Sequence, residues 1–487
     1  MPEADEEMPL NGGSSTRPSI LKTKSYRGVT VYGSVGDRED SPSIVTYAKG
    51  TLDKSSSSGR RAAFRSVASS SLGSGKGSFR DSVHSFSRTS FRLPGEACSV
   101  RDLGGRATVS TQVFNLTKNI IGAGVLALPS GIAAFGNAPS ALFPAALLTA
   151  VTGAIFGYYF SLIGRVCKLT MTATYRESWE KTVGEAGSAF VALVIILKAA
   201  LANLTYSMIL ADAGRSVLET LGVRASRSAA LVGVTVSILL PLCLLKNLAV
   251  LAPFSLVGLA GMLFTLLAMT LRYFDGTYDA ERNGLFLSDL DERRRPAFGS
   301  TGAGGALGPN ALVFACMLFE AYVAHYNAPR FFVELKDNTI PRFNGVTVSS
   351  FGISVVFFIL AFAVGFLAFG SASSGFILNN YSSKDILATI SRVAIFVAVV
   401  TTYPLVFLGT RDGVLDLLIV PTELQTSSNL NVLSVVILTI ITVTAAFVTN
   451  LGLVAAVGGG TLATAVVFIF PALMFRFAIR NEGAEAS

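Results

Sequence analysis

The chain has 487 residues, of which 51% are hydrophobic and only 14% are charged, with a net charge of +8 and a mean hydropathy of +0.56. Soluble proteins carry about 25% charged residues. The composition therefore does not indicate a soluble multidomain protein. Apolar runs of roughly 18–25 residues recur from about residue 110 onward, and each is long enough to cross the ~30 Å hydrocarbon core of a bilayer. We therefore expect an all-α polytopic membrane protein.

Residues 1–106 form a Ser/Arg-rich segment that holds about 16 of the 39 Lys and Arg residues. It has too little apolar surface to offset the chain entropy lost on folding, so we expect a disordered cytosolic tail. A basic segment can bind nucleic acid, but this one has no interleaved stacking aromatics and belongs to a membrane chain. We therefore expect no nucleic-acid partner.

About ten membrane spans are expected after the tail, followed by a short C-terminal tail at 476–487. The spans are predicted near 112–136, 138–164, 187–211, 228–245, 250–272, 307–329, 346–370, 384–408, 432–449 and 452–475. Lys and Arg are enriched in the loops that lie on the same side of the membrane as the N-terminus, which favours a cytosolic N-terminus. The glycosylation sequon Asn380-Tyr-Ser then falls in an outer loop, in agreement with this orientation.

Ten spans divide into five plus five, and inverted-repeat transporters break the first helix of each half at the bilayer midplane. In this chain those are the first and sixth spans. The first contains Gly122, Gly124 and Pro129, and the sixth contains LFEAYVAHYNAPRFF, which is polar and interrupted by proline. The region 107–475 is therefore predicted to be a transporter with two broken helices.

The sequence GAGVLA in the first span also fits the G-x-G-x-x-A dinucleotide fingerprint. That motif needs a preceding strand and a following helix, whereas its flanks here are membrane spans. The glycines instead suit unwound backbone that lines a cavity, where free amides and the positive end of a helix dipole can bind a carboxylate. Close helix packing through small residues is the alternative.

Charges within membrane spans are costly and usually functional, and three of the charged residues within the predicted spans are candidates for such a role. Lys118 lies about six residues, or ~9 Å, into the first span, so it either snorkels to the interface or serves the site. Glu320, in the sixth span, either carries a proton or pairs with a lysine or free amides. Lys198, in the third span, has a packing or pairing role or a functional one.

Three further polar residues are candidates for ion coupling. His325 lies at the break in the sixth span and either shuttles protons or is a hydrogen-bonded structural residue. Thr401 and Thr402 precede Pro404 in the eighth span, where hydroxyls and freed carbonyls can bind a cation or merely satisfy the helix backbone. The four cysteines show no CxxC spacing, so neither a metal site nor another cofactor is expected.

Several segments in the same order resemble the amino acid/auxin permease family of secondary transporters over about residues 107–475. VFNLTKNIIGAGVLALPSGI is similar to the family's first helix and SRVAIFVAVVTTYPLVFLGTRD to its eighth, while AHYNAPRFFVELKD and VGGGTLATAVVFIFPALMF look like the sixth and tenth. The resemblance implies a five-plus-five inverted-repeat fold of the LeuT type and an α-amino acid substrate. The expected substrate-binding residues are Gly122, Ala123, Gly124, Val125, Leu126, Phe319 and Tyr322.

The resemblance also bears on the coupling ion. Sodium-coupled members have asparagine at the position of Lys118, whereas proton-coupled members resemble this chain in having lysine there and a pair like Phe319-Glu320. The segment from His325 to Leu335 looks more like the sodium-coupled branch. We expect H⁺ coupling, with an ammonium beside Thr402 in place of Na⁺, and the ion-coupling residues are predicted to be Lys118, Glu320, His325, Thr401 and Thr402.

The sequence thus predicts a secondary active transporter, proton-coupled or sodium-independent, that moves amino acids across a membrane by alternating access. The alternatives are a sodium-coupled neutral amino acid symporter and an amino acid sensor that signals through its N-terminal tail. An enzyme is not expected, because no span presents a Ser/His/Asp set or an HExxH motif. The expected location is the plasma membrane or a vacuolar or lysosomal membrane.

Overall fold

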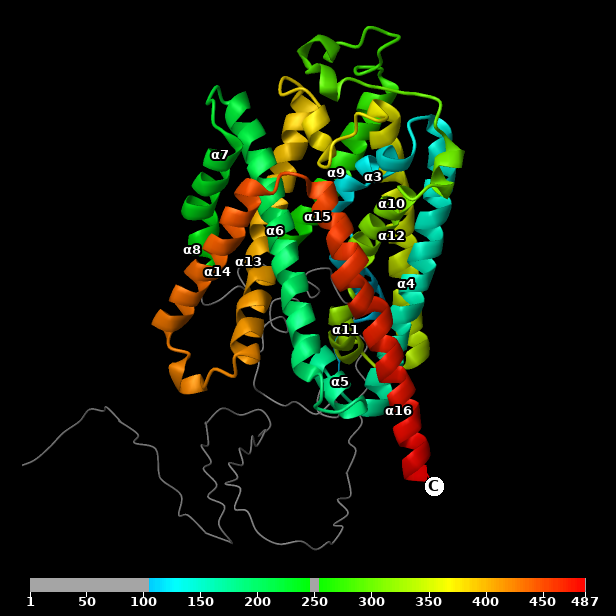
Figure 1. Ribbon diagram of the computed structural model, residues 1–487, viewed down its shortest axis with the longest axis vertical. Coiled ribbons are helices and arrows are strands. Elements are labelled where there is room, and N and C mark those ends of the chain that lie inside the picture. The colour runs from blue at the N-terminus through cyan, green and yellow to red at the C-terminus, as the bar shows by residue number, and fades with distance from the viewer. Residues whose placement is uncertain (1–104, 246–253, 487) are drawn as a thin grey trace, which may run out of the picture. The chain divides into compact units, whose positions relative to one another are not determined.

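The computed structural model describes residues 105–245 and 254–486 (Figure 1). Almost all of the predicted tail at 1–106 lies outside these residues. Within the described part of the chain the regular structure is helical, apart from two isolated β-bridges. The all-α fold class is therefore confirmed, and the labels α and η below denote α-helices and short 3₁₀ or π segments.

The first half of the bundle contains the five predicted spans in order. Its elements are α2 (Val109–Ile120), η1 (Ala123–Ala127), α3 (Leu128–Phe135), η2 (Pro139–Ala141), α4 (Leu142–Thr170), α5 (Tyr175–Thr182), α6 (Ser188–Thr220), α7 (Arg227–Val234), η3 (Thr235–Leu239), α8 (Leu240–Cys243) and α9 (Phe254–Phe274). The segment α5 is an additional short helix between the second and third spans. A long connection with three short turns then leads to the second half: η5 (Leu287–Asp289), η6 (Glu292–Arg294) and η7 (Ala303–Leu307).

The second half repeats the arrangement with another five spans. Its elements are α10 (Ala311–Tyr322), η8 (His325–Asn327), α11 (Ala328–Glu334), α12 (Ile340–Phe369), η9 (Ile377–Asn380), α13 (Ile386–Leu417), η10 (Thr422–Leu424), α14 (Ser427–Phe447), α15 (Leu451–Gly458), η11 (Gly459–Ala463), η12 (Ala465–Ile469) and α16 (Phe470–Ala486). Because α16 remains helical to Ala486, the region from 476 is part of a helix, which the sequence did not predict.

Eight of the described helices are long and apolar enough to cross a membrane, and a ninth span is added if the bent pair of Val109–Ile120 and Ala123–Phe135 counts as one. The predicted fourth span corresponds to the apolar segment Arg227–Cys243, which is shorter than these helices. Apolar side chains face outward along the spans. On α4 the exposed residues Phe143, Leu147, Val151 and Ile155 recur every fourth position and so form one face, as expected of a helix in contact with lipid.

The packing of the helices repeats between the two halves, as an inverted repeat requires. The second spans of the halves, α4 and α12, pack together, and so do the third spans, α6 and α13. The last span of the first half, α9, packs on α12 and α13, while its counterpart, formed by α15 and α16, packs on α4 and α6. Likewise α2 packs on α12, and α10 packs on α4. These reciprocal contacts bring the two broken spans into the centre of the bundle.

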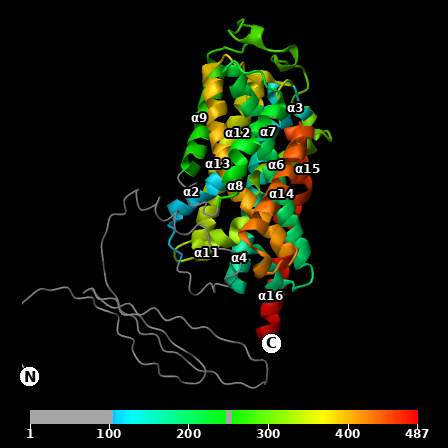
Figure 2. The same ribbon diagram turned by 90° about the vertical axis from the view of Figure 1, so that its left-hand side faces the viewer.

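Both broken spans also meet at the end of the bundle where α2 begins. Ala107 forms a two-hydrogen-bond bridge to the end of α11, donating to Glu334 O at 3.1 Å and accepting from Lys336 N at 2.9 Å. The buried Gln112 side chain donates to Phe331 O at 3.2 Å. Figure 2 shows α2 and α11 at this same end. The start of the first span is therefore tied to the end of the sixth.

The outer-loop sequon has a structural role in the folded chain. Asn380 is fully buried, its side-chain amide donates to Ala372 O at 2.8 Å, and its side-chain oxygen accepts from Ser374 N at 2.9 Å. A glycan on Nδ2 would not fit beside these contacts, because the side chain is fully buried. The sequon therefore does not support the predicted orientation, because its asparagine is buried within the folded protein.

Candidate functional site

The first span breaks between α2 and the segment formed by η1 and α3. α2 ends at Ile120, Ile121 has a ψ of 88°, and Gly122 is extended. The axes on either side differ by 41°. Adjacent β-branched isoleucines and a glycine disfavour helix at this point, while Pro129 lies in the first turn of α3, where proline is tolerated. The predicted break is therefore encoded locally.

The glycines of this span have two different roles. A Cβ added to Gly122 or Gly124 would meet no atom within 4 Å, whereas one added to Gly131 would lie 2.8 Å from Phe314 Cδ2. Close helix packing therefore explains Gly131. At Gly122 and Gly124 the missing side chains leave open space beside the backbone, as the binding-site interpretation requires.

The sixth span breaks after Tyr322, where α10 ends. Val323 is extended, with φ −69° and ψ 110°, and a single 3₁₀ turn from His325 leads into α11. The last carbonyls of α10 and the first amides of the second half of the first span have no partner within their own helices. The two breaks thus present backbone groups of opposite polarity.

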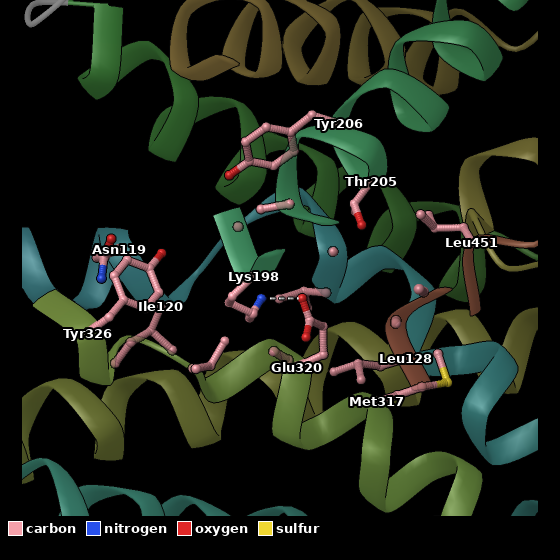
Figure 3. Close-up of a pocket in the computed structure, with 18 residues that line it drawn as sticks. Asn119, Ile120, Leu128, Lys198, Thr205, Tyr206, Met317, Glu320, Tyr326 and Leu451 are labelled. Carbon is pink, nitrogen blue, oxygen red and sulfur yellow. Dashed lines mark hydrogen bonds and ion pairs between the residues drawn. The ribbon is translucent and has the colours of Figure 1, made fainter. Parts of the chain in front are cut away.

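A cavity of about 110 Å³ lies between the two breaks, with further walls from α6 and α15 (Figure 3). This is room for several water molecules. Apolar residues such as Met317 and Leu451 form part of the wall. The polar side chains that line it are Asn119, Lys198, Thr205, Tyr206, Glu320 and Tyr326.

An ion pair crosses this cavity. Lys198 Nζ, on α6, lies 2.5 Å from Glu320 Oε1, on α10, and only 5% and 14% of the two side chains are exposed (Figure 3). The structure thus shows the pairing that the sequence offered for both residues, while a proton-carrying role for Glu320 stays a prediction. A buried pair offsets the desolvation of each charge through the other, so neither residue can be changed alone without leaving a buried charge.

Three of the five substrate-binding residues predicted in the first span line the cavity, and two do not. Gly122, Gly124 and Val125 line it. The side chains of Ala123 and Leu126 are buried in the surrounding core, so these two residues can offer a ligand only backbone groups.

The two aromatic residues predicted to bind substrate pack elsewhere. Phe319 packs against Phe156 in a tilted arrangement and against Phe468 edge to face, with ring centroids 5.3 and 5.6 Å apart. Tyr322 is fully buried and donates its hydroxyl to Thr149 O at 3.2 Å. Neither residue lines the cavity; both fix α10 against α4.

Lys118 lies in the last turn of α2, one turn before the break, and is half-buried. A cation in the last turn of a helix is favoured by the negative end of the helix dipole. Its neighbour Asn119 lines the cavity, whereas Lys118 does not. The structure therefore places Lys118 next to the site, on the α2 side of the break.

His325 is fully buried, and its Nε2 lies 3.0 Å from Phe156 O. An imidazole nitrogen bonded to a carbonyl must donate, so Nδ1 carries no proton in the neutral ring, and none of the described residues forms a hydrogen bond with it. The rings of Phe156, Phe160 and Phe351 surround the imidazole at 5.5–6.2 Å between centroids. This environment is that of the structural histidine considered from the sequence.

Thr401 and Thr402 donate their hydroxyls within their own helix. Thr401 Oγ1 bonds Val397 O at 2.9 Å, and Thr402 Oγ1 bonds Ala398 O at 2.8 Å. Proline cannot donate to the carbonyl four residues before it, which for Pro404 is that of Val400, and the two threonine hydroxyls bond other carbonyls. The hydroxyl oxygens keep acceptor capacity.

Sequence reasoning missed the face of α6 that lines the cavity. Besides Lys198 it comprises Ala202, Thr205 and Tyr206, and the buried Thr205 hydroxyl has no hydrogen-bond partner within residues 105–245 and 254–486. These positions follow Lys198 by four, seven and eight residues, which is the spacing of one helix face. A search of the sequence for residues on the same helix face as Lys198 would have identified them.

Comparison with known proteins agrees with this architecture. The family model described as "Transmembrane amino acid transporter protein" matches residues 105–486. A Danio rerio protein named "Putative sodium-coupled neutral amino acid transporter 11" is 27% identical over 378 residues, covering 76% of this chain and 79% of that protein. The Mus musculus protein of the same name is 24% identical over 379 residues, covering 76% and 78%.

Solved structures show the fold. An inward-facing conformation of Mhp1 matches with a TM-score of 0.53 at 12% identity, over 80% of each chain. MhsT in complex with L-phenylalanine matches with a TM-score of 0.45 at 13% identity, over 76% of this chain and 97% of that one. Together with the repeated packing, the likeness to Mhp1 supports the broken-helix inverted repeat predicted from the sequence.

The family match spans nearly all of the described residues. It indicates a membrane transporter and not an enzyme, and it agrees with the segments in which the sequence resembles known permeases. This chain is therefore a multi-pass membrane protein that belongs to the transmembrane amino acid transporter family, the amino acid/auxin permeases.

Proposed function

We propose that this chain is a secondary active transporter that binds its amino acid in the cavity between the two helix breaks. The observation that carries this proposal is the open space at Gly122 and Gly124, beside unwound backbone. The amides of Ala123 and Gly124 begin the second half of the first span, where helix amides lack internal partners and the dipole attracts anions. They would hold the substrate carboxylate, and alternating access would then move the two repeats around the site.

The same cavity supports coupling to protons without sodium. Lys118 provides a fixed positive charge one turn before the break, and Glu320 shares the cavity with Lys198, Tyr206 and Tyr326. A proton on Glu320 would remove the negative charge that holds Lys198. Release of α6 from α10 would then depend on protonation, which links transport to a pH gradient.

A sodium-coupled neutral amino acid symporter is the second candidate. It is favoured by the names of the two relatives described above, which call them sodium-coupled. In this case the acceptor oxygens of Thr401 and Thr402 would contribute to the cation site, with His325 and Lys118 remaining structural.

Uptake by the purified chain in proteoliposomes separates these candidates. Radiolabelled amino acids are supplied under an inward pH gradient without sodium, or under a sodium gradient at equal pH. We expect accumulation with the pH gradient and a reduced pH response in Lys118→Asn. Accumulation with sodium alone would contradict proton coupling, and an unchanged pH response in Lys118→Asn would contradict the role of Lys118 in that coupling. Failure to move any amino acid under either gradient would contradict the proposed function itself.

A further inference from the structure

One oxygen of the cavity carboxylate is left without a partner among the described residues. Glu320 Oε1 binds Lys198, whereas Oε2 is buried and accepts no hydrogen bond from this part of the chain. Leaving a buried charged acceptor unsatisfied is costly, and native structures rarely retain such an atom without a reason. A ligand that brings a hydrogen-bond donor into the cavity would satisfy it.

Glycines of α15 lie close to this carboxylate. A Cβ on Gly458 would lie 2.9 Å from Glu320 Oε2, and a Cβ on Gly459 would lie 1.7 Å from Cys316 O. These glycines are at the junction of α15 and the π segment η11, and π segments inside helices are frequent at functional sites. The glycine run VGGGT thus allows α15 to approach α10 closely, with no side chain of its own between Gly458 and Oε2.

The polarity of the cavity walls matches a zwitterion. The amides of Ala123 and Gly124 begin a helical segment and present its positive end, which favours a carboxylate. Glu320 lies two residues before the end of α10, where the dipole and the carbonyls are negative and favour a cation. An ammonium bound to a carboxylate makes a charge-assisted hydrogen bond, the stronger kind.

We propose that Glu320 Oε2 accepts the α-ammonium group of the bound amino acid, while Lys198 keeps Oε1. This assignment rests on the proposed function, because it presumes that the amino acid occupies this cavity. It makes Glu320 a selectivity residue for the α-amino group. It also gives the substrate a means of acting on the ion pair between α6 and α10, since its ammonium shares the carboxylate with Lys198.

Matched ligands test the assignment. Binding is measured by titration calorimetry on the purified full-length chain in lipid nanodiscs. The pairs are L-alanine with propionate, L-leucine with 4-methylpentanoate, and L-lysine with 6-aminohexanoate. In each pair the second ligand lacks only the α-amino group. We expect the wild type to bind at least one amino acid on the order of tenfold or more tightly than its partner, the ratio that a hydrogen bond to a charged group provides.

Variants then locate that preference. Glu320→Gln is expected to lose it, mainly by weakening the amino acid and not its deaminated partner. Glu334→Gln, on the exposed face of α11 and paired with Arg330, is the matched control and should keep it. Gly458→Ala places a methyl group against Oε2 and should reduce the preference for the amino acid. This variant replaces Glu320→Gln in the test if Glu320→Gln does not fold.

The experiment distinguishes a failure of the proposed binding cavity from a failure of the Glu320 assignment. Gly124→Leu fills the open space of the cavity and should abolish binding of both ligands of a pair. If binding survives Gly124→Leu, or if no amino acid binds the wild type, the cavity is not the site and both proposals fail. If Gly124→Leu abolishes binding but the wild type has no preference for the amino acid, or Glu320→Gln keeps that preference, only the Glu320 assignment fails.

Discussion

At the scale of single residues, the surroundings of a glycine separate binding from packing more clearly than the sequence does. Gly124 and Gly131 lie in the same broken span, yet a Cβ would enter open space at the first and contact Phe314 and Met317 at the second. Neither residue has a positive φ, so neither is required for backbone strain. Substitutions at the two positions should therefore fail in different ways.

Gly124→Leu is expected to remove transport with little change in thermal stability, because a Cβ at this position meets no atom within 4 Å and the position lines the cavity. Gly131→Ala should instead destabilise the protein by about 1–3 kcal/mol, the usual cost of overpacking, while the molecules that remain folded still transport. Thermal unfolding in detergent and proteoliposome uptake would be measured on both variants. An unstable Gly124→Leu protein would contradict the open space.

The Lys198–Glu320 pair leads to a second prediction at this scale. Lys198→Met leaves a buried carboxylate without its counterion and should cost about 3–5 kcal/mol. Replacing both partners, Lys198→Met together with Glu320→Gln, should recover most of the lost stability, since no charge is then buried. Unfolding of the two single variants and the double variant forms a cycle, and additive losses would show that the residues are not coupled.

Individual residues also mark where sequence reasoning stopped. The sequence predicts that Phe319 and Tyr322 bind substrate, and it leaves His325 as either a proton shuttle or a structural residue. In the structure all three side chains point into the aromatic core between α4, α10 and α12. Glu320, their neighbour on α10, lines the cavity. Helix period alone does not reveal which face of a central helix meets a cavity, because such a helix is surrounded by protein on all sides.

At the scale of elements, the breaks were predictable and the ties between them were not. Glycine and proline interrupt a helix through local backbone chemistry, so the sequence located both interruptions. The bridge between Ala107 and the end of α11 joins segments more than two hundred positions apart. No local pattern predicts that contact, although it couples the first half of one broken span to the second half of the other.

Gly105→Ala tests this bridge, because a Cβ there would lie 2.4 Å from Leu335 O. We expect the bridge to open, leaving amino acid affinity unchanged but slowing transport severalfold, since α2 and α11 would no longer move together. Gly345→Ala is the control, because its Cβ would meet no atom within 4 Å. Initial uptake rates and binding constants would be compared, and equal rates for the two variants would exclude a coupling role.

At the scale of the whole molecule, the reciprocal packing of the two halves explains why the fold could be inferred from so little. Once the chain was divided into five plus five spans, the position of each break followed from the repeat. The division survives even though Arg227–Cys243 is shorter than the other spans, because α7 still packs on α6 and α14. The details of the cavity did not follow, since they depend on side chains from α6 and α15 that approach only after assembly.

The orientation of the bundle is the last prediction, and it now depends on charge alone, because Asn380 is buried. The connection at 275–306 carries six acidic and four basic residues, whereas the opposite end includes Arg176, Lys181 and Lys336. We expect this second end to be cytosolic. Single cysteines at the exposed positions Ser300 and Ser428, in a chain without its native cysteines, would be labelled from outside intact cells by a membrane-impermeant maleimide. Labelling of Ser300→Cys alone agrees with the prediction, and labelling of Ser428→Cys alone reverses it. If the chain resides in an internal membrane, the labelling is done on isolated vesicles whose cytosolic face points outward. In those vesicles the cytosolic end of the bundle is the end labelled from outside.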